Sequence, residues 1–164
     1  MEIRRAEPRD IDGVMPLFDK ARRIMRASGN VKQWANGYPA EETIRQDIAN
    51  GNFWVCTDPD GTILGGFALI PGEELTYRKI YNGKWLDSES PYATIHRLAA
   101  TAPGLGLASL CFSWCATRYP NLRADTHRDN KIMQHVLTKA GFRYCGIIYL
   151  ANGDERLAYQ RIEG

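Results

Sequence analysis

Hydrophobic and polar positions change period several times along the chain, and each change marks an expected element. Residues 2–7 alternate as a strand does, and from Pro8 to Met25 apolar residues recur every three or four positions, as on one face of a helix. The turn DPDG at 58–61 separates two apolar runs and predicts a hairpin. The full pattern predicts strands at 2–7, 53–57, 62–70, 92–100, 122–126, 142–150 and 155–162, and helices from 8 to about 28 and at 39–50, 105–118 and 130–140.

This order, β-α-α-β-β-β-α-β-α-β-β, predicts an α/β (α+β) fold built on one mixed, mainly antiparallel central sheet of about seven strands flanked by four helices. Hairpins at both ends give antiparallel pairs, whereas the helix at 105–118 joins its two flanking strands in one parallel crossover. The stretch 71–91 is less regular, and we expect a tiny hairpin at 80–85. No repeat or linker divides the chain, which predicts a single domain over 1–164.

Composition and charge exclude several classes of function. The chain is 44% hydrophobic and 24% charged, as is ordinary for a folded globular protein. A net charge of +2 gives little support for a nucleic-acid partner. No apolar stretch approaches the roughly 20 residues of a membrane span, and the N-terminus lacks the apolar core of a secretory signal. We therefore expect a cytoplasmic protein without a membrane partner.

The cysteines fit a reduced compartment better than a metal site. Cys111 and Cys115 lie four apart and so share one face of the predicted helix at 105–118, where they read as small buried hydrophobic residues. The sequence has no C-x-x-C pair and no histidine spaced locally with these cysteines. No metal site is expected.

A glycine turn between the strand at 92–100 and the next helix carries the first candidate chemistry. A helix N-terminus presents backbone N–H groups without partners and a partial positive charge, and so binds phosphate without any charged side chain. Gly104 and Gly106 allow a sharp turn and a close ligand, and Ala108 and Ser109 keep the first helical turn slim. A tight connection that binds nothing is the alternative.

Two well-known phosphate-binding motifs fit this turn poorly. A Walker P-loop ends in Gly-Lys-Ser/Thr, and the turn has no lysine. A dinucleotide-binding site is closer, because GLGLAS at 104–109 approximates G-x-G-x-x-G and Asp125 follows about 20 residues on. However, the third glycine is missing, and so are the flanking βαβ units.

The ordered set of segments resembles the GNAT (GCN5-related) superfamily of acetyl-CoA-dependent N-acetyltransferases over nearly the whole chain. LAATAPGLGLA at 98–108 is similar to the family's pyrophosphate-binding segment, and LRADTHRDNKIMQHVLTKAGF at 122–142 to the strand and helix that follow. Two positions depart from the family pattern. Pro103 stands where a Gln or Arg is usual, and Leu137 where many members carry a tyrosine that protonates the departing thiolate.

The resemblance implies an acyl-CoA N-acyltransferase (GNAT) fold with acetyl-CoA as co-substrate and no metal. Backbone groups of the fourth strand would bond the pantetheine arm and polarise the thioester carbonyl, while the turn would hold the pyrophosphate. Asn130 would reach the pantetheine, although capping of the helix that it opens is an equally good explanation. The implied cofactor-binding residues are Leu98, Ala99, Ala100, Gly104, Leu105, Gly106, Leu107, Ala108, Ser109 and Asn130.

Acetyl transfer to an amine needs a base, because an amine with a pKa near 10.4 is protonated at pH 7. The resemblance places the base near His96, whose unperturbed pKa near 6.5 suits the task; a histidine that caps a nearby backbone group in the sheet is the alternative. With no tyrosine at Leu137, Tyr144 is the candidate acid, followed by Tyr149 and His127.

The acceptor is expected to be a primary amine, on a small molecule or peptide, bound between the start of the chain and the 71–91 stretch. Aromatic rings and carboxylates suit a cationic amine, although some of these aromatics could simply pin loops to the core. The candidate residues are Trp34, Tyr38, Glu73, Tyr77 and Trp85, with Glu74, Asp87 and Glu89 nearby. A non-catalytic acyl-CoA-binding module and a dinucleotide-binding protein are the competing hypotheses, and a homodimer is possible.

Overall fold

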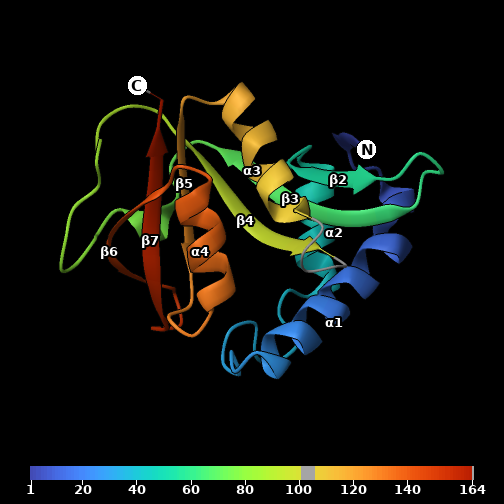
Figure 1. The fold of residues 1–164 in the computed structure, drawn as a ribbon, viewed down its shortest axis with the longest axis horizontal. Coiled ribbons are helices and arrows are strands. Elements are labelled where there is room, and N and C mark those ends of the chain that lie inside the picture. Colours follow the sequence, from blue (N-terminus) through green and yellow to red (C-terminus); the bar gives the residue numbers. More distant parts are fainter. Residues whose placement is uncertain (101–105, 164) are drawn as a thin grey trace.

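The computed structural model describes residues 1–100 and 106–163, which form one seven-stranded sheet in the order β1-β2-β3-β4-β5-β7-β6 (Figure 1). The strands are β1 (Glu2–Arg5), β2 (Phe53–Thr57), β3 (Ile63–Pro71), β4 (Ala93–Ala100), β5 (Asn121–Thr126), β6 (Arg143–Tyr149) and β7 (Glu155–Ile162). The helices are α1 (Ile11–Ala27), α2 (Glu41–Ala49), α3 (Leu107–Arg118) and α4 (Lys131–Lys139), with 3-10 turns η1 (Pro8–Asp10) and η2 (Leu75–Tyr77). The predicted element order and mixed sheet are confirmed, and β4–β5 is the parallel pair.

Two helical layers and one long connection cover the sheet. One hydrophobic cluster joins α1 and α2 to the strands β2, β3 and β4, around Phe18 and Phe53. A second cluster packs α3 and α4 on the opposite face, around Phe112 and Leu122. The connection 72–92 covers β6 and β7 with a third, aromatic cluster that contains Tyr77.

The tiny hairpin expected at 80–85 is wrong. Tyr81 instead forms a single antiparallel bridge with Ile147 of β6, in which both backbone N–H···O distances are 2.8 Å. Gly83 lies so close to β6 that a Cβ there would overlap the carbonyl oxygen of Cys145. The Asn82-Gly83 pair therefore lays the connection against the sheet rather than turning a hairpin.

The parallel pair β4–β5 is short, and this positions the candidate site. Its register runs only from Ala93 opposite Leu122 to Thr94 opposite Arg123. Beyond that point β4 bulges away from its other neighbour, β3, and Arg97 adopts a left-handed backbone conformation, with φ of 53°. A bulge adds one residue to a strand and bends it, so β4 and β5 separate and leave a cleft in the middle of the sheet.

Candidate active site

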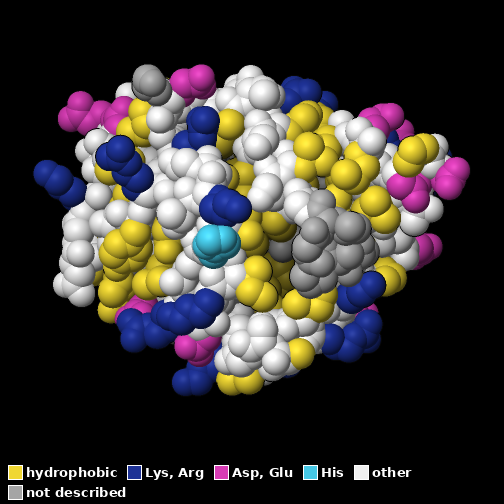
Figure 2. Space-filling view, in the orientation of Figure 1, with side chains coloured by type: hydrophobic (Ala, Val, Ile, Leu, Met, Phe, Trp, Pro, Cys, Tyr) yellow, Lys and Arg dark blue, Asp and Glu magenta, His cyan; other side chains and the backbone are white. Residues whose placement is uncertain are grey.

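A cavity of about 470 Å³ occupies the cleft between β4 and β5. Figure 2 shows a hollow in one face of the molecule, bordered by hydrophobic side chains, between the positions of α4 and α1 in Figure 1. The lining comes from the end of α1, the α1–α2 connection, η2 with its N-cap, β4, β5, α3, α4, the β6–β7 turn and the start of β7. Its ionisable and polar members include Lys32, Tyr38, Glu74, Thr76, His96, Arg97, Asp125, Thr126, Asn130, Asp154 and Arg156.

His96 and Glu74 form a hydrogen-bonded pair at the cavity wall. His96 Nε2 lies 3.2 Å from Glu74 Oε1, while Glu74 Oε2 accepts from the backbone N–H (2.8 Å) and the hydroxyl (2.9 Å) of Thr76. The His96 hydrogen bond and the Thr76 amide hold the pKa of Glu74 at about 2, against an ordinary 4.5. An ionised carboxylate only accepts, so Nε2 of a neutral His96 carries the proton and Nδ1 keeps a free lone pair. The pair can therefore act as a base at Nδ1.

Asp125 comes from β5, across the cleft from His96, and is fixed from behind by Tyr77. The Tyr77 hydroxyl donates to Asp125 Oδ2 at 2.6 Å, and Trp85 Nε1 donates to the Tyr77 carbonyl oxygen at 3.0 Å. Burial raises the pKa of Tyr77 well above 10, and the charge of Asp125 adds to the effect. Tyr77 thus keeps its proton and donates it in a hydrogen bond to Asp125 beside the cavity.

Arg97, at the bulge, joins β4 to α2. Its guanidinium donates to both carboxylate oxygens of Asp47, from Nε at 2.8 Å and from Nη2 at 2.9 Å, and Nη1 donates to the hydroxyl of Tyr38 at 3.1 Å. The side chains of Arg97 and Asp47 are only 13% and 9% exposed. This ion pair holds the irregular part of β4 in place and sets the Tyr38 ring at the cavity.

Of the predicted cofactor segment at 98–109, Leu98 lines the cavity, whereas the other described residues are not among the lining residues. Gly104, Leu105 and the unusual Pro103 are outside the described residues. Gly106 is the N-cap of α3 with φ of 70°, and as a glycine it has no side chain with which to cap this helix. The amide groups of its first turn, in Leu107, Ala108 and Ser109, therefore remain candidates for binding an anion.

The wall between α3, α4 and β5 is mainly apolar. Leu98, Phe112, Met133 and Leu137 line it, and Leu137 is fully buried. Thr126, at the end of β5, also lines the cavity, and its buried hydroxyl has no hydrogen-bond partner among residues 1–100 and 106–163. An apolar slot with one unsatisfied hydroxyl fits the pantetheine arm, which is an aliphatic chain with spaced amide groups.

Asn130 caps α4 and also bridges to the α1–α2 connection. Its Oδ1 accepts from the Met133 amide, and its Nδ2 donates to Gln33 Oε1, both at 3.0 Å. Gln33 Oε1 accepts a second bond from Asn30 Nδ2 at 2.7 Å. The capping alternative from the sequence is therefore present, and contact of Asn130 with pantetheine stays a prediction.

Several residues expected at the site lie elsewhere. Tyr144 is 51% exposed on β6, where its ring packs against Tyr159, and it does not reach the cavity. Tyr77 and Trp85 are buried in the third cluster and pin the 72–92 connection, so they act behind the site. Glu73 points outward and pairs with Arg78. These placements correct the expectations for Tyr144, Tyr77, Trp85 and Glu73, whereas Trp34, Tyr38 and His96 do line the cavity.

Other lining residues were missed from the sequence. Arg97 reads as one more polar position in a strand, and Gln33 and Arg156 stand in segments without a motif. Asp125 drew attention only as a ribose ligand for a dinucleotide. Their positions in the chain are the signal that could have identified two of them. Asp125 lies near the end of the strand that follows the crossover helix, and Arg156 follows the turn of the last hairpin.

The described part of the chain shows neither a metal-binding cluster nor a membrane-spanning helix. Over 1–100 and 106–163, no group of three or more His, Cys, Asp or Glu side chains could hold a metal ion. No helix in the same part of the chain is long and apolar enough to cross a membrane. All four cysteines are free and buried, and burial raises the pKa of Cys111 to about 12.

Comparison with known proteins gives a full-length match among solved structures. No protein-family model and no curated protein matches the chain. A GNAT-family acetyltransferase from Streptococcus agalactiae is 40% identical, with a TM-score of 0.91, covering 99% of this chain and 95% of that one. A GNAT-family acetyltransferase from Listeria monocytogenes is 18% identical, with a TM-score of 0.72 over 98% and 93% of the two chains. A phosphinothricin acetyltransferase from Sinorhizobium meliloti, solved with AcCoA, is 14% identical, with a TM-score of 0.64 over 99% and 88%.

Proposed function

The chain belongs to the GNAT family of acetyltransferases, which use acetyl-CoA, and we propose that it transfers the acetyl group directly to a primary amine with His96 as the base. The observation that carries the proposal is the His96–Glu74 pair at the wall of the β4–β5 cleft. The dinucleotide-binding alternative lacks support, because β4–β5 is the one parallel pair among the described strands.

Acetyl-CoA fits the features of the cleft. The N-terminus of α3, which begins at Gly106, would hold the pyrophosphate through backbone N–H groups, and the apolar slot beside Leu137 would take the pantetheine. Backbone groups of β4 at Leu98, Ala99 and Ala100 would bond the pantetheine amides and polarise the carbonyl of the thioester. The unpartnered hydroxyl of Thr126 would gain a hydrogen bond on binding.

His96 would take a proton from the acceptor ammonium at Nδ1, while Glu74 stabilises the imidazolium through Nε2. The neutral nitrogen then attacks the thioester carbonyl carbon. A C–N bond forms, the C–S bond breaks, and the sulfur leaves as a thiolate. The second proton of the nitrogen is lost to water, and the imidazolium or water protonates the thiolate. No residue of α4 needs to act as acid, in keeping with Leu137.

The proposal extends to the location, the domain organisation and the acceptor of the enzyme. We propose a cytoplasmic single-domain enzyme over residues 1–164 whose acceptor is a small-molecule or peptide amine, without a nucleic-acid or membrane partner. The four free, buried cysteines are in keeping with a reducing compartment. A homodimer stays a prediction that light scattering can check.

The test combines turnover with direct binding. Wild-type protein and the His96→Gln variant are assayed for thiol release from acetyl-CoA against a panel of primary amines, and acetyl-CoA affinity is measured by calorimetry. We expect His96→Gln to lower kcat/KM by about 10²–10⁴-fold while the affinity stays unchanged. The exposed His135 on α4 gives the control, His135→Gln, with unchanged rates. Tight binding of acetyl-CoA without turnover on any amine would instead identify a non-catalytic acyl-CoA-binding module.

A further inference from the structure

Arg156 is a buried cation at the cavity that lacks a carboxylate partner among the described residues. It is only 6% exposed, and the one hydrogen bond of its side chain runs from Nη1 to the backbone oxygen of Glu155 at 2.9 Å. A buried charge is costly unless it is paired. Such a charge, held beside a substrate cavity, is therefore expected to find its partner in a ligand.

The carboxylates around Arg156 are engaged with other groups. Asp125 accepts from the Tyr77 hydroxyl, and Asp154 accepts from Asn152 Nδ2 at 3.2 Å within the β6–β7 turn. Glu155 pairs with Arg128 on the surface. None of these three forms an ion pair with Arg156 within the described chain.

A second cavity, of about 410 Å³, adjoins the first at Arg156. The two share Lys32, Asp154 and Arg156 in their linings, and the second also contains His127. The pKa of His127 is lowered by burial and then by the charge of Arg156, with a smaller contribution from Lys32. Asp129 opposes this shift, and Asp154 and Glu155 also line the second cavity. Because Glu155 pairs with Arg128, an acidic ligand group placed where the cavities meet would find Arg156 and Lys32 without an ion-pair partner in the described chain.

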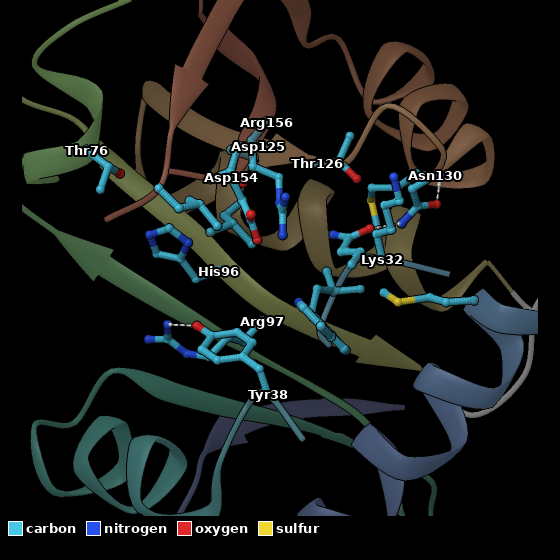
Figure 3. A pocket seen from close by; sticks show the side chains of 18 of the residues that line it. Lys32, Tyr38, Thr76, His96, Arg97, Asp125, Thr126, Asn130, Asp154 and Arg156 are labelled. Atoms are coloured by element: carbon cyan, nitrogen blue, oxygen red, sulfur yellow. Dashed lines mark hydrogen bonds between the residues drawn. The ribbon is translucent and has the colours of Figure 1, made fainter. Parts of the chain in front are cut away.

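Negative charge lies next to the base, His96. In Figure 3 the side chains of Asp125, Asp154 and Arg156 gather on one side of the cavity, while those of His96, Arg97 and Tyr38 lie on the other. Glu74, hydrogen-bonded to His96, supplies negative charge beside the base that suits an ammonium group awaiting deprotonation. The charge of Arg97 is already matched by Asp47, so Arg156 and Lys32 are the lining cations without a carboxylate partner among the described residues.

We propose that the acceptor is a small amine that also carries an acidic group, of amino-acid type, and that Arg156, assisted by Lys32, binds this group while the amine faces His96. A guanidinium matches a carboxylate with two parallel hydrogen bonds. The acceptor must be small, because the cavity of about 470 Å³ also admits the thioester end of acetyl-CoA. This inference rests on the proposed function for the position of the amine, but not for the binding of the anion.

The experiment compares matched acceptors on the wild-type protein. Amino acids are assayed beside their carboxamides and their decarboxylated amines, together with a lysine-containing peptide. We expect kcat/KM for the best amino acid to exceed that of its carboxamide by about 10- to 100-fold, the value of a hydrogen bond to a charged group. A wild-type preference for the carboxamide, the decarboxylated amine or the peptide overturns the proposal.

Variants then assign the preference to Arg156. Arg156→Gln should remove most of the ratio between amino acid and carboxamide, chiefly through KM, and Lys32→Gln should reduce it by about 2- to 5-fold because Lys32 is exposed. Arg143→Gln is the control, since it removes an exposed charge that does not line either cavity. An unchanged ratio in Arg156→Gln refutes the proposal. If the melting curve shows that Arg156→Gln is unfolded, Arg156→Lys and Lys32→Gln test the proposal instead. For Arg156→Lys we expect a ratio of amino acid to carboxamide between 1 and the wild-type ratio.

Binding measurements separate this inference from the proposed function. Calorimetry on CoA-saturated protein detects amino-acid binding without requiring turnover. Binding that Arg156→Gln abolishes, in a protein that never releases thiol, supports the anion site and refutes the catalytic proposal. Turnover on amines without any preference for those that carry an acidic group supports the catalytic proposal and refutes the anion site.

Discussion

Replacing Asp47 by alanine tests whether the Arg97–Asp47 ion pair holds the bulge of β4. The substitution removes two hydrogen bonds, of 2.8 and 2.9 Å, and leaves a guanidinium that is 13% exposed without its carboxylate. Breaking a buried ion pair from one side costs about 3–5 kcal/mol. Arg97 keeps its hydrogen bond to Tyr38 and some contact with solvent, so we expect a loss of unfolding free energy at the lower end of this range, about 3 kcal/mol.

Thermal and urea unfolding measure this loss. For a chain of this size, about 3 kcal/mol corresponds to a melting point lower by about 6–12 °C. Glu41→Ala, which breaks the exposed Glu41–Arg45 pair on the same helix, is the control and should cost less than about 1 kcal/mol. Because the bulge adjoins the cleft, the Michaelis constant for acetyl-CoA should rise in Asp47→Ala and stay constant in Glu41→Ala.

The backbone at Arg97 provides an independent check. A non-glycine residue in the left-handed region costs roughly 1–2 kcal/mol, and φ here is 53°. Arg97→Gly should therefore be more stable than Arg97→Ala by about 1 kcal/mol, although both lose the ion pair. A cost below about 1 kcal/mol for Asp47→Ala, or no difference between the two Arg97 variants, would refute the view that the pair holds a strained bulge.

Three further outcomes follow from the site. The folded-state pKa of Glu74 is about 2 against an ordinary 4.5, so the unfolded chain binds more protons between these two pH values. Stability is therefore lost as the pH falls from about 4.5 to 2. Glu74→Gln should flatten this dependence of the unfolding free energy on pH, measured by urea titration, and an unchanged dependence would exclude Glu74 as its source. Tyr77→Phe should destabilise the fold by about 1.5–3 kcal/mol, because Asp125 loses a bond to its charged oxygen, and a melting point equal to the wild type's would contradict the role of Tyr77 behind the site. Tyr144→Phe should retain full kcat/KM, because the ring lies outside the cavity; a large drop in thiol release would return it to the list of catalytic groups.

The regular elements were predictable because each depends on local pattern. The apolar period of α1, the DPDG turn after β2 and the asparagine that opens α4 are all visible in the sequence, and the structure has them at nearly the expected residues. The glycine turn before α3 was likewise visible, with Gly106 observed as its N-cap.

The site was less predictable because it depends on contacts between distant residues. The strand at 92–100 reads as uninterrupted, yet its bulge at Arg97 is held by Asp47 from another helix. Tyr77 and Trp85 have the composition of an amine-binding pocket, but packing against β6 and β7 buries both of them. Only the folded chain shows that Arg156 lines the cavity and that, like Lys32, it has no carboxylate partner in the described part of the chain.

The short β4–β5 ladder also bears on how the molecule can move. Within the described residues, the pairing of Ala93 and Thr94 with β5 is the strand ladder that joins two half-sheets, β1–β4 and β5–β7, and side-chain hydrogen bonds such as that of Asn130 to Gln33 add to it. A rotation of one half-sheet about this joint would widen or narrow the cleft while every other ladder stayed intact. The opening and closing of the cleft, and with it the release of products, would then occur about a hinge that is two residue pairs long and ends three residues before Arg97 on β4.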